Sequence, residues 1–382
     1  MNRQLDELIK KEYHHLGSTY FNTAYFGPSP YSAKQKVSRA LQKELDPSFY
    51  DYNTWMGISE RMRVLIADFL GTSADHITHS TSSSDIINTI ANGYQFKKGD
   101  KVVSLNREYP SNTLPWMLAS ERGEVEFELL ELNGEIVPSV EWLKKHLPKE
   151  TRIFNISHVT FDTGKKIDLL GIGRLMQERD ILFVVDTTQS LGGMPITAEE
   201  LAVIDVLTCA SYKWILGPYG HAFGYFSEKA QKLVQHTTAN WIKSPNSKVV
   251  YSLLDYTTET LPGARKYDRG QASNFLAMAC LEAGLEFLMA AKLDKIAEHN
   301  AKLRDHFLDH YPKQKFELIT PKEHMGNILA LKCKNVDSIT LERELKFRNI
   351  DISVRQGNLR LSFHVFNNLD QVETLLKAID VE

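Results

Sequence analysis

The chain has 382 residues, of which 42% are hydrophobic and 24% are charged, and its formal net charge is −3. This composition is that of a soluble globular protein long enough for two domains, and the near balance of charge gives no reason to expect nucleic acid or an anionic membrane as a partner. The three cysteines, Cys209, Cys280 and Cys333, are too few and too scattered for a disulfide framework or a zinc site. The charged N-terminus lacks the apolar core of a signal peptide, so we expect a cytoplasmic protein.

The first part of the chain predicts helices joined by turns. Residues 2–15 predict a short amphipathic helix, and residues 31–45 and 57–70 have helical periodicity. Between the first two lies YFNTAYFGPSP, whose glycine and prolines predict a loop packed by its aromatic side chains. Asn22 and Tyr25 in this loop are also candidates for contacts with a substrate.

The next segment, ITHSTSSSDIINTIANGY, predicts a turn that opens into a helix. Small hydroxyl side chains run from Ser80 to Ser84, followed by Asp85 and an apolar stretch of helical period. A serine N-cap explains this pattern by itself, and it is the more common explanation. The free N–H groups and positive potential of a helix N-terminus can also hold a phosphate group, but that function needs support from other residues.

From residue 101 onward, short apolar segments alternate with helix-like segments. The apolar segments are KVVSL, VEFELLEL, RIFNIS and ILFVVD, with helices expected near 111–121, 138–147 and 168–178. This alternation predicts parallel strands joined by crossover helices in an α/β fold. Ligands of such open sheets bind beyond the carboxyl ends of the strands. Polar residues that follow the strands would therefore meet at one edge of the sheet: Arg107, Glu108, Tyr109, Ser157, His158, Asp186 and Lys213.

Asp186 and Lys213 form the most informative pair at that edge. A carboxylate directly after an apolar strand is costly to desolvate unless it caps a turn or meets a cation, such as a pyridinium nitrogen. Lys213 lies between Tyr212 and Trp214, where partial desolvation can release its proton and make it a Schiff-base nucleophile. Taken singly, each residue is more simply explained as a turn residue or an exposed residue. About one crossover unit separates the two residues, which makes the pair more specific than either residue alone. We expect them to hold one pyridoxal phosphate, and Gln189, one helical turn after Asp186, could reach the same ligand.

The motifs TSSSDIIN, REYPSNTLPW, VVDTTQS, ASYKWILGPYG and RLSFHVFNN, in this order, resemble the class V aminotransferase family of fold-type I pyridoxal phosphate enzymes. This family includes cysteine desulfurases, kynureninases, isopenicillin N epimerase-like proteins and aminotransferases for small substrates. The resemblance implies a large domain with a mainly parallel sheet and a smaller C-terminal α+β domain. With the segment pattern, it predicts an N-terminal arm or helix over 1–20, the large cofactor-binding domain over 21–270, and a spine helix and small domain over 271–382.

The resemblance also implies a role for residues around the cofactor ring. Lys213 would form the Schiff base and later transfer the proton at the substrate α-carbon. Asp186 would pair with the pyridine nitrogen and keep the ring an electron sink. Gln189 would hydrogen-bond the ring hydroxyl, and Tyr109 would stack on the ring face.

A second group of residues matches the family's contacts to phosphate and substrate. Ser83 and Ser84 match its phosphate-binding pair, and Tyr212 matches a further phosphate contact. Gln271 matches the position that reaches the phosphate from the partner subunit, which implies a homodimer whose sites use both chains. Arg360 matches the arginine that binds the substrate carboxylate, a task suited to its planar fork.

Departures from the family pattern bear on the reaction. Cysteine desulfurases carry a persulfide-forming cysteine shortly before the matching arginine, but this chain runs DISVRQGNLRLS there and has no cysteine after Cys333. Among the possible reactions of this chain, we therefore expect desulfurase activity least. Phe161 stands where many relatives have an asparagine near the ring. Tyr109 replaces a histidine that desulfurases use as an acid or base, and the PS after it resembles the epimerase-like branch.

The sequence thus predicts a pyridoxal phosphate-dependent enzyme that acts on an α-amino acid. Transamination is the first expectation because it needs no catalytic group beyond the lysine. A carbon–sulfur lyase of the desulfurase-like type or an amino-acid epimerase is the alternative, and a cofactor-binding scaffold without turnover is the alternative from another class. A nucleotide-using enzyme is disfavoured because no Gly-x-Gly-x-x-Gly or Walker motif follows any strand.

Overall fold

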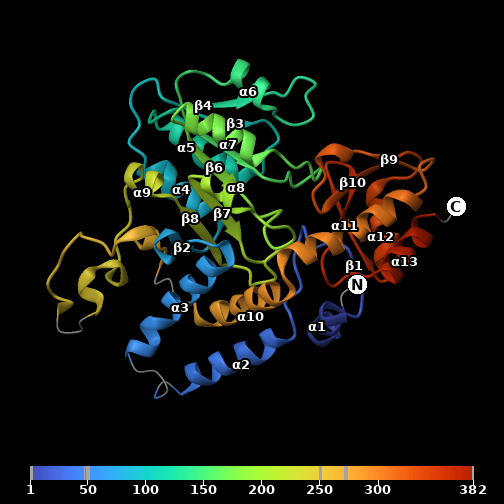
Figure 1. The fold of residues 1–382 in the computed structure, drawn as a ribbon, viewed down its shortest axis with the longest axis horizontal. Helices are drawn as coiled ribbons and strands as arrows, with labels where there is room; N and C mark the ends of the chain where they lie inside the picture. Colours follow the sequence, from blue (N-terminus) through green and yellow to red (C-terminus); the bar gives the residue numbers. More distant parts are fainter. Residues whose placement is uncertain (1–2, 47, 49–51, 249–251, 271–273, 381–382) are drawn as a thin grey trace.

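The computed structural model describes residues 3–46, 48, 52–248, 252–270 and 274–380. Within them, a larger part built around a twisted sheet lies beside a smaller part that contains the C-terminal segment (Figure 1). No helix of these residues is long and apolar enough to cross a membrane, and they contain no group of three or more His, Cys, Asp or Glu side chains able to hold a metal ion.

The central sheet of the larger part has, among the described residues, seven strands in the order β2-β8-β7-β6-β5-β3-β4. Neighbouring strands are parallel except at β8, which is antiparallel to both β2 and β7. The alternating segments of the sequence therefore form the mainly parallel sheet that they predict. The strands are β2 (Ile77–Ser80), β3 (Lys101–Leu105), β4 (Glu126–Leu130), β5 (Thr151–Ser157), β6 (Leu182–Asp186), β7 (Val206–Ala210) and β8 (Ala222–Phe226).

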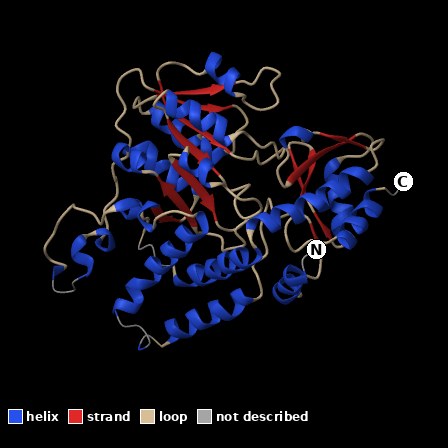
Figure 2. Cartoon of the chain, in the orientation of Figure 1, coloured by secondary structure: helices blue, strands red, loops and turns tan. Residues whose placement is uncertain are grey.

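Helices cover both faces of this sheet, as Figure 2 shows. Along β6, Val184 packs into a hydrophobic cluster with α4 and α5, whereas Phe183 and Val185 pack into a cluster with α3, α7 and α10 on the other face. A strand buried on both faces must be apolar throughout, which is why ILFVVD reads as a continuous apolar run. The helices of the larger part are α2 (Ser32–Leu45), α3 (Tyr52–Leu70), α4 (Ser83–Gly93), α5 (Leu114–Glu121), α6 (Val140–His146), α7 (Leu169–Glu178), α8 (Ala198–Ala202), α9 (Glu228–Leu233) and α10 (Phe275–Ala291).

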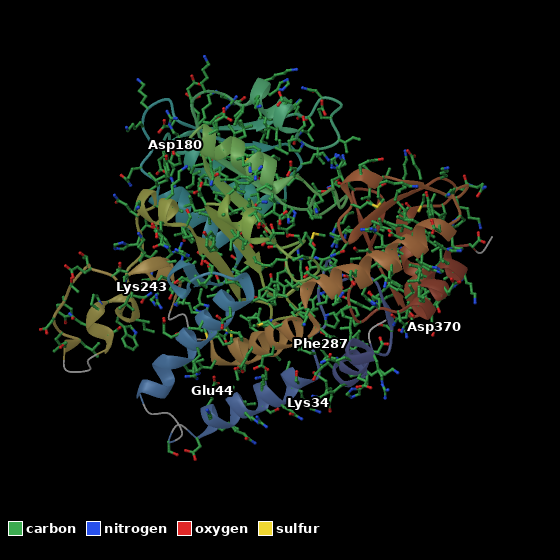
Figure 3. All side chains as sticks on the ribbon, viewed as in Figure 1. Lys34, Glu44, Asp180, Lys243, Phe287 and Asp370 are labelled. Carbon is green, nitrogen blue, oxygen red and sulfur yellow. The ribbon has the colours of Figure 1, made fainter. Side chains whose placement is uncertain are left out.

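The predicted helices occur with shifted ends. Helix α3 begins at Tyr52, before the expected start at residue 57, because Gly57 weakens the helical signal without interrupting the helix. Helix α10 packs against α2 and α3. Between α9 and α10 the chain has short 3-10 turns, Trp241–Lys243 and Pro245–Lys248, in a segment that projects from the larger part around the labelled Lys243 (Figure 3).

The smaller part combines an antiparallel sheet with helices, and its sheet has the order β12-β13-β10-β9. The N-terminal β1 pairs in parallel with β11, so the first strand of the chain joins this C-terminal part. Phe21 packs into the same hydrophobic cluster. The domain limits of 1–20, 21–270 and 271–382 stay a prediction. The elements are α1 (Arg3–Tyr13), β1 (Thr19–Tyr20), α11 (Leu293–His310), β9 (Phe316–Leu318), β10 (Ile328–Cys333), α12 (Ser338–Phe347), β11 (Ile350–Asp351), β12 (Ser353–Arg355), β13 (Asn358–Ser362) and α13 (Leu369–Ile379).

Candidate active site

A cavity of about 210 Å³ lies beyond the carboxyl ends of β6 and β7, beside the N-terminus of α4. This is the edge of the sheet at which the sequence predicts a ligand. Six of the residues predicted from the sequence line this one cavity: Ser83, Ser84, Tyr109, Asp186, Tyr212 and Lys213.

The turn that carries Lys213 is fixed by close packing of its backbone. The N–H of Gly27 donates to the carbonyl oxygen of Tyr212 at 2.8 Å, and a Cβ atom at Gly27 would overlap the carbonyl oxygen of Lys213. Gly192 has a φ of +100°, and a Cβ atom there would overlap the carbonyl oxygen of Trp214. Glycine is needed at both positions because the backbones approach each other directly.

The Lys213 side chain is only 6% exposed. Its Nζ lies 5.4 Å from the ring centroid of Tyr109 and 5.4 Å from that of Tyr212. Burial lowers the pKa of Lys213 to about 8, although the Asp186 carboxylate opposes this shift. About a tenth of the amine is therefore unprotonated at pH 7, far more than for an ordinary lysine, and this is the form that attacks a carbonyl carbon.

Asp186 is a buried carboxylate at the end of β6. Burial raises its pKa, while hydrogen bonds from Thr188, whose N–H donates to Oδ1 at 2.8 Å, and the charge of Lys213 oppose the rise. A second carboxylate, Glu108, accepts hydrogen bonds from the N–H of Ser157 at 2.9 Å and from its Oγ at 2.5 Å, and burial raises its pKa as well. Two buried acids at this edge favour a cationic ligand, and a protonated pyridine nitrogen fits Asp186.

The N-terminus of α4 provides hydroxyl groups and free N–H groups at the other end of the cavity. The helix is capped by Ser82, and its first two residues are Ser83 and Ser84. The Ser83 Oγ lies 3.1 Å from the Oγ1 of Thr188, and the Ser84 Oγ donates to Ser111 at 2.7 Å. Hydroxyls gathered at the positive end of a helix dipole fit a phosphate group.

Several lining residues have no role predicted from the sequence, and three of them, Ser111, Thr188 and His221, carry polar side chains that contact other site residues or the cavity. Ser111 and Thr188 stand inside the motifs REYPSNTLPW and VVDTTQS, so those motifs contained the signal. His221 is 4% exposed, and its Nδ1 lies 2.9 Å from the Ser211 Oγ. Burial lowers its pKa to about 3, so the ring is neutral, and no described residue hydrogen-bonds its Nε2.

Arg360 lies on β13 and is 2% exposed. Its Nε donates to the Ser353 Oγ at 3.1 Å and its Nη1 donates to the Phe161 carbonyl oxygen at 2.7 Å. Burial lowers the pKa of Arg360 to about 9, and the neighbouring charge of Arg355 adds to this shift. Its Nη2 is buried and has no partner among the described residues, so one face of the guanidinium group is free for a carboxylate.

Phe161, for which the family resemblance implied an asparagine, contacts two site residues. Its ring packs edge-on against Tyr109, with the centroids 5.2 Å apart, and its carbonyl oxygen holds Arg360. Because its ring is apolar, it supplies packing where an asparagine would supply hydrogen bonds. Phe161 therefore supports the positions of Tyr109 and Arg360.

Gln189 is not among the described residues that line the cavity. Gln189 uses its Nε2 to donate to the Ala24 carbonyl oxygen at 3.1 Å, and its Oε1 accepts from the Nε1 of Trp214 at 3.0 Å. Gln271 lies outside the described residues. The contacts of both residues with the cofactor stay predictions.

The two predicted substrate contacts near the N-terminus also lie outside the cavity lining. The Nδ2 of Asn22 donates to the Ile352 carbonyl oxygen at 3.2 Å, and its Oδ1 is buried without a partner among the described residues. Tyr25 is 58% exposed, and its ring centroid lies 5.8 Å from the guanidinium carbon of Arg355. Their contacts with a substrate stay predictions.

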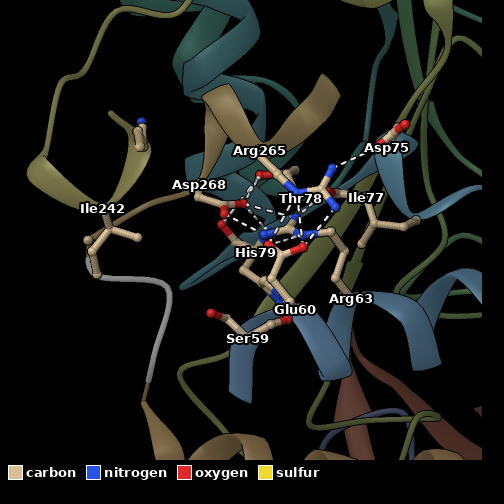
Figure 4. A network of polar contacts seen from close by, with 12 residues as sticks. Ser59, Glu60, Arg63, Asp75, Ile77, Thr78, His79, Ile242, Arg265 and Asp268 are labelled. Carbon is tan, nitrogen blue, oxygen red and sulfur yellow. Dashed lines mark hydrogen bonds and ion pairs between the residues drawn. The ribbon is translucent and has the colours of Figure 1, made fainter. Parts of the chain in front are cut away.

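A buried ionic network fixes the chain just before Gln271, as Figure 4 shows. Asp268 binds the Nη2 of Arg63 at 2.6 Å and accepts the N–H of His79 on β2 at 2.9 Å. Arg265 pairs with Glu60 on α3 at 2.7 Å. These contacts hold the segment before Gln271 against β2 and α3.

The family model described as aminotransferase class-V matches residues 50–375 of the chain. Together with the mainly parallel sheet and the cavity at its carboxyl edge, this match defines a fold-type I enzyme. The chain belongs to the class-V aminotransferase family, whose cofactor is pyridoxal phosphate.

Several known proteins are similar to this chain along most of its length. A probable cysteine desulfurase of Pyrococcus abyssi is 25% identical over 338 residues, which cover 84% of this chain and 82% of that protein. An uncharacterized aminotransferase of Schizosaccharomyces pombe is 23% identical over 372 residues, which cover 94% and 91%. A solved complex of a cystine C–S lyase with its product cysteine persulfide has a TM-score of 0.85 at 17% identity, over 95% of this chain and 98% of that one. The structural likeness shows the shared fold.

Proposed function

We propose that this chain transfers the amino group of a small α-amino acid through the Lys213 amine. One observation carries the proposal: the buried Lys213 amine, with its pKa lowered to about 8, faces the same cavity as the Asp186 carboxylate and the N-terminus of α4. When bound there, pyridoxal phosphate supplies an electron sink for the electrons released at the substrate α-carbon.

The residues around the cavity have separate tasks in holding this cofactor. Ser83, Ser84 and Tyr212 would bind the phosphate group, with the α4 dipole adding to its stabilisation. Asp186 would keep a proton on the ring nitrogen, because a buried carboxylate is stabilised by a cation beside it. Tyr109 would lie against the ring and limit its motion.

Two residues act on the amino acid itself. Arg360 would bind the α-carboxylate through its free Nη2, which orients the bond between the α-carbon and its hydrogen. Lys213 would take the proton from the α-carbon and return it elsewhere on the reacting system, since an amine with a pKa near the working pH serves as both base and acid. No further acid or base is required for transamination.

The cysteines support transamination over a persulfide mechanism. None of the described residues that line the cavity is a cysteine. Cys209 is buried at the end of β7, where burial raises its pKa far above the usual range. Cys280 lies on α10, with its Sγ 3.4 Å from the Oγ of Ser29, and Cys333 ends β10. A desulfurase needs a thiolate beside its substrate, and these three residues are not suited to that role.

Carbon–sulfur bond cleavage by β-elimination is the second candidate. Relatives of this chain carry the name probable cysteine desulfurase, and a cystine C–S lyase has the same fold. This reaction begins with the same proton transfer at the α-carbon and needs no enzyme thiol. It would therefore suit a cavity whose described lining contains Lys213 and no cysteine.

A product screen of the purified, cofactor-loaded protein tests the proposal. Amino acids are supplied with and without a 2-oxo acid acceptor, while the cofactor spectrum and the products are followed. Transamination predicts a new 2-oxo acid and amination of the acceptor, with no more than one turnover per site when the acceptor is absent. Ammonia, pyruvate and a reduced sulfur product without acceptor would instead establish the lyase. A spectrum unchanged by every amino acid would indicate a scaffold.

Replacing the lysine tests its assignment directly. In Lys213→Ala, borohydride treatment should leave no cofactor bound to the protein by mass spectrometry, and the rate should fall by about 10²–10⁴-fold or more because the base is lost. The exposed Lys232 provides the control, and Lys232→Ala should keep both properties. A reducible attachment that survives in Lys213→Ala would assign the nucleophile to another residue.

A further inference from the structure

Two arginines project from one face of the β12–β13 hairpin. Ser353 on β12 is directly opposite Arg360 on β13, and Arg355 is opposite Asn358. Side chains alternate along a strand, so Arg355, two residues after Ser353, lies on the same face as Ser353 and Arg360. Arg355 and Arg360 are thus diagonal neighbours, whose Cα atoms are about 7–8 Å apart in such a pair.

Arg355 is a half-buried cation without a carboxylate partner among the described residues. Its Nη1 donates to the carbonyl oxygen of its neighbour Val354 at 2.7 Å, and its guanidinium group lies over the ring of Tyr25. Its charge lowers the pKa of Arg360 and also that of Lys213. Arg360, its neighbour on this face, binds the carbonyl oxygen of Phe161, and the Phe161 ring packs on Tyr109 of the cavity lining. The hairpin face that carries Arg355 therefore lies beside the cavity.

The charges around Arg360 do not balance. Asp162 is the carboxylate that opposes the lowered pKa of Arg360, and it pairs with Arg107 at 2.9 Å. Among the described residues that interact here, the guanidinium groups of Arg107, Arg355 and Arg360 thus share a single carboxylate, that of Asp162. Arg360 retains a free Nη2, and Arg355 lacks an acidic partner. Partly desolvated cations are costly unless an anion accompanies them, so the imbalance favours a ligand with two negative groups.

We propose that the substrate is an amino acid with a second carboxylate, and that Arg355 binds this group while Arg360 binds the α-carboxylate. This inference specifies the proposed function and rests on it. Two guanidinium groups on one face of a hairpin can each form charge-assisted hydrogen bonds to a separate carboxylate. Aspartate, glutamate and cystine belong to this class of substrate, whereas their neutral analogues lack the group that Arg355 would bind.

Binding of unreactive acids to the cofactor-loaded protein provides the first test. Glutarate has two carboxylates and pentanoate has one at similar length, and their affinities are measured by calorimetry and by the change in cofactor absorbance. Wild type should bind glutarate about tenfold or more tightly than pentanoate, the effect of one charged hydrogen bond. Arg355→Met should abolish this preference without changing pentanoate affinity, and Arg355→Lys should keep part of it. The exposed Arg174 on α7 gives the control, and Arg174→Met should behave as wild type.

Equal affinities in wild type, or unchanged glutarate affinity in Arg355→Met, would overturn the inference. Turnover separates this failure from failure of the proposed function. If glutamine and glutamate have equal kcat/KM, the inference is wrong although the enzyme acts on amino acids. If glutarate binding depends on Arg355 but no amino acid is converted, the two-carboxylate site stands and the proposed reaction fails.

Discussion

Two buried lysines of this chain show why a shifted pKa alone does not identify a nucleophile. Burial lowers the pKa of both Lys213 and Lys243 to about 8. The Nζ of Lys243 donates to the carbonyl oxygen and the Oγ1 of Thr238, at 3.1 and 2.9 Å. No described residue hydrogen-bonds the Nζ of Lys213, which faces two aromatic rings and the cavity. Lys213 is therefore available to a ligand, whereas Lys243 already has structural partners.

The pKa of Lys213 sets the pH dependence of cofactor attachment. Its pKa is lowered, so the amine is protonated below about pH 8 and unprotonated above it. Only the unprotonated amine attacks a carbonyl carbon. The rate at which the apoprotein gains the cofactor chromophore should therefore rise as the pH passes about 8 and then level off, as followed by stopped-flow absorbance.

The Asp186 carboxylate provides a control for this pH profile. Its charge raises the pKa of Lys213, so Asp186→Asn should move the midpoint of the profile below that of wild type. Lys213→Arg should gain no chromophore at any pH. A rate that is independent of pH, or that falls across this range, would contradict the assignment of the amine.

The sequence indicates which residues lie at the cavity where they follow a strand, and it does not do so where distant segments meet. Asp186 and Tyr109 follow predicted strands, and the shared direction of those strands brings them to one cavity. His221 follows a glycine turn that has no chemical signature of its own. The amide of Gln189 binds Ala24 and Trp214, which no spacing along the chain could have indicated.

At the scale of elements, the site depends on contact between opposite ends of the chain. The loop after β1 brings Gly27 against the Lys213 turn, while Ser362 on β13 accepts the N–H of Ala24 at 3.0 Å. The strand pairing that holds this loop, β1 with β11, involves two short strands. Short strands give little periodic signal, so the sequence predicts a loop there without predicting its partner.

Gly27→Ala should disturb the Lys213 turn because the new Cβ would overlap the Lys213 carbonyl oxygen. Overpacking of this kind costs about 1–3 kcal/mol of unfolding free energy, measured by denaturant titration. The same variant should bind the cofactor more weakly, because the backbone of the turn must shift. Gly17→Ala is the matched control, since a Cβ atom at Gly17 meets nothing within 4 Å. Equal stability and cofactor affinity in the two variants would show that the contact at Gly27 is dispensable.

At the scale of the whole molecule, the alternation of apolar and helical segments is enough to predict the mainly parallel sheet, because each crossover unit repeats the same pattern. The reversed strand β8 is not predictable in this way, since its apolar run AFGYF resembles those of the parallel strands. A site shared between two chains would depend on information beyond one chain. The Asp268 network fixes the chain before Gln271, the residue expected to reach the phosphate of a partner subunit.

Mixed dimers test whether the sites are shared. The protein should have about twice the 43.6 kDa mass of one chain by light scattering, as a symmetric dimer would. Lys213→Ala removes the nucleophile, and Gln271→Glu should repel the phosphate through its charge, so each variant alone should be nearly inactive. If Lys213 and Gln271 of one site come from different chains, a mixed dimer has one intact site, and random mixing should restore about a quarter of wild-type activity. If both residues of a site come from one chain, mixing restores nothing. A monomer in solution would also refute the shared site.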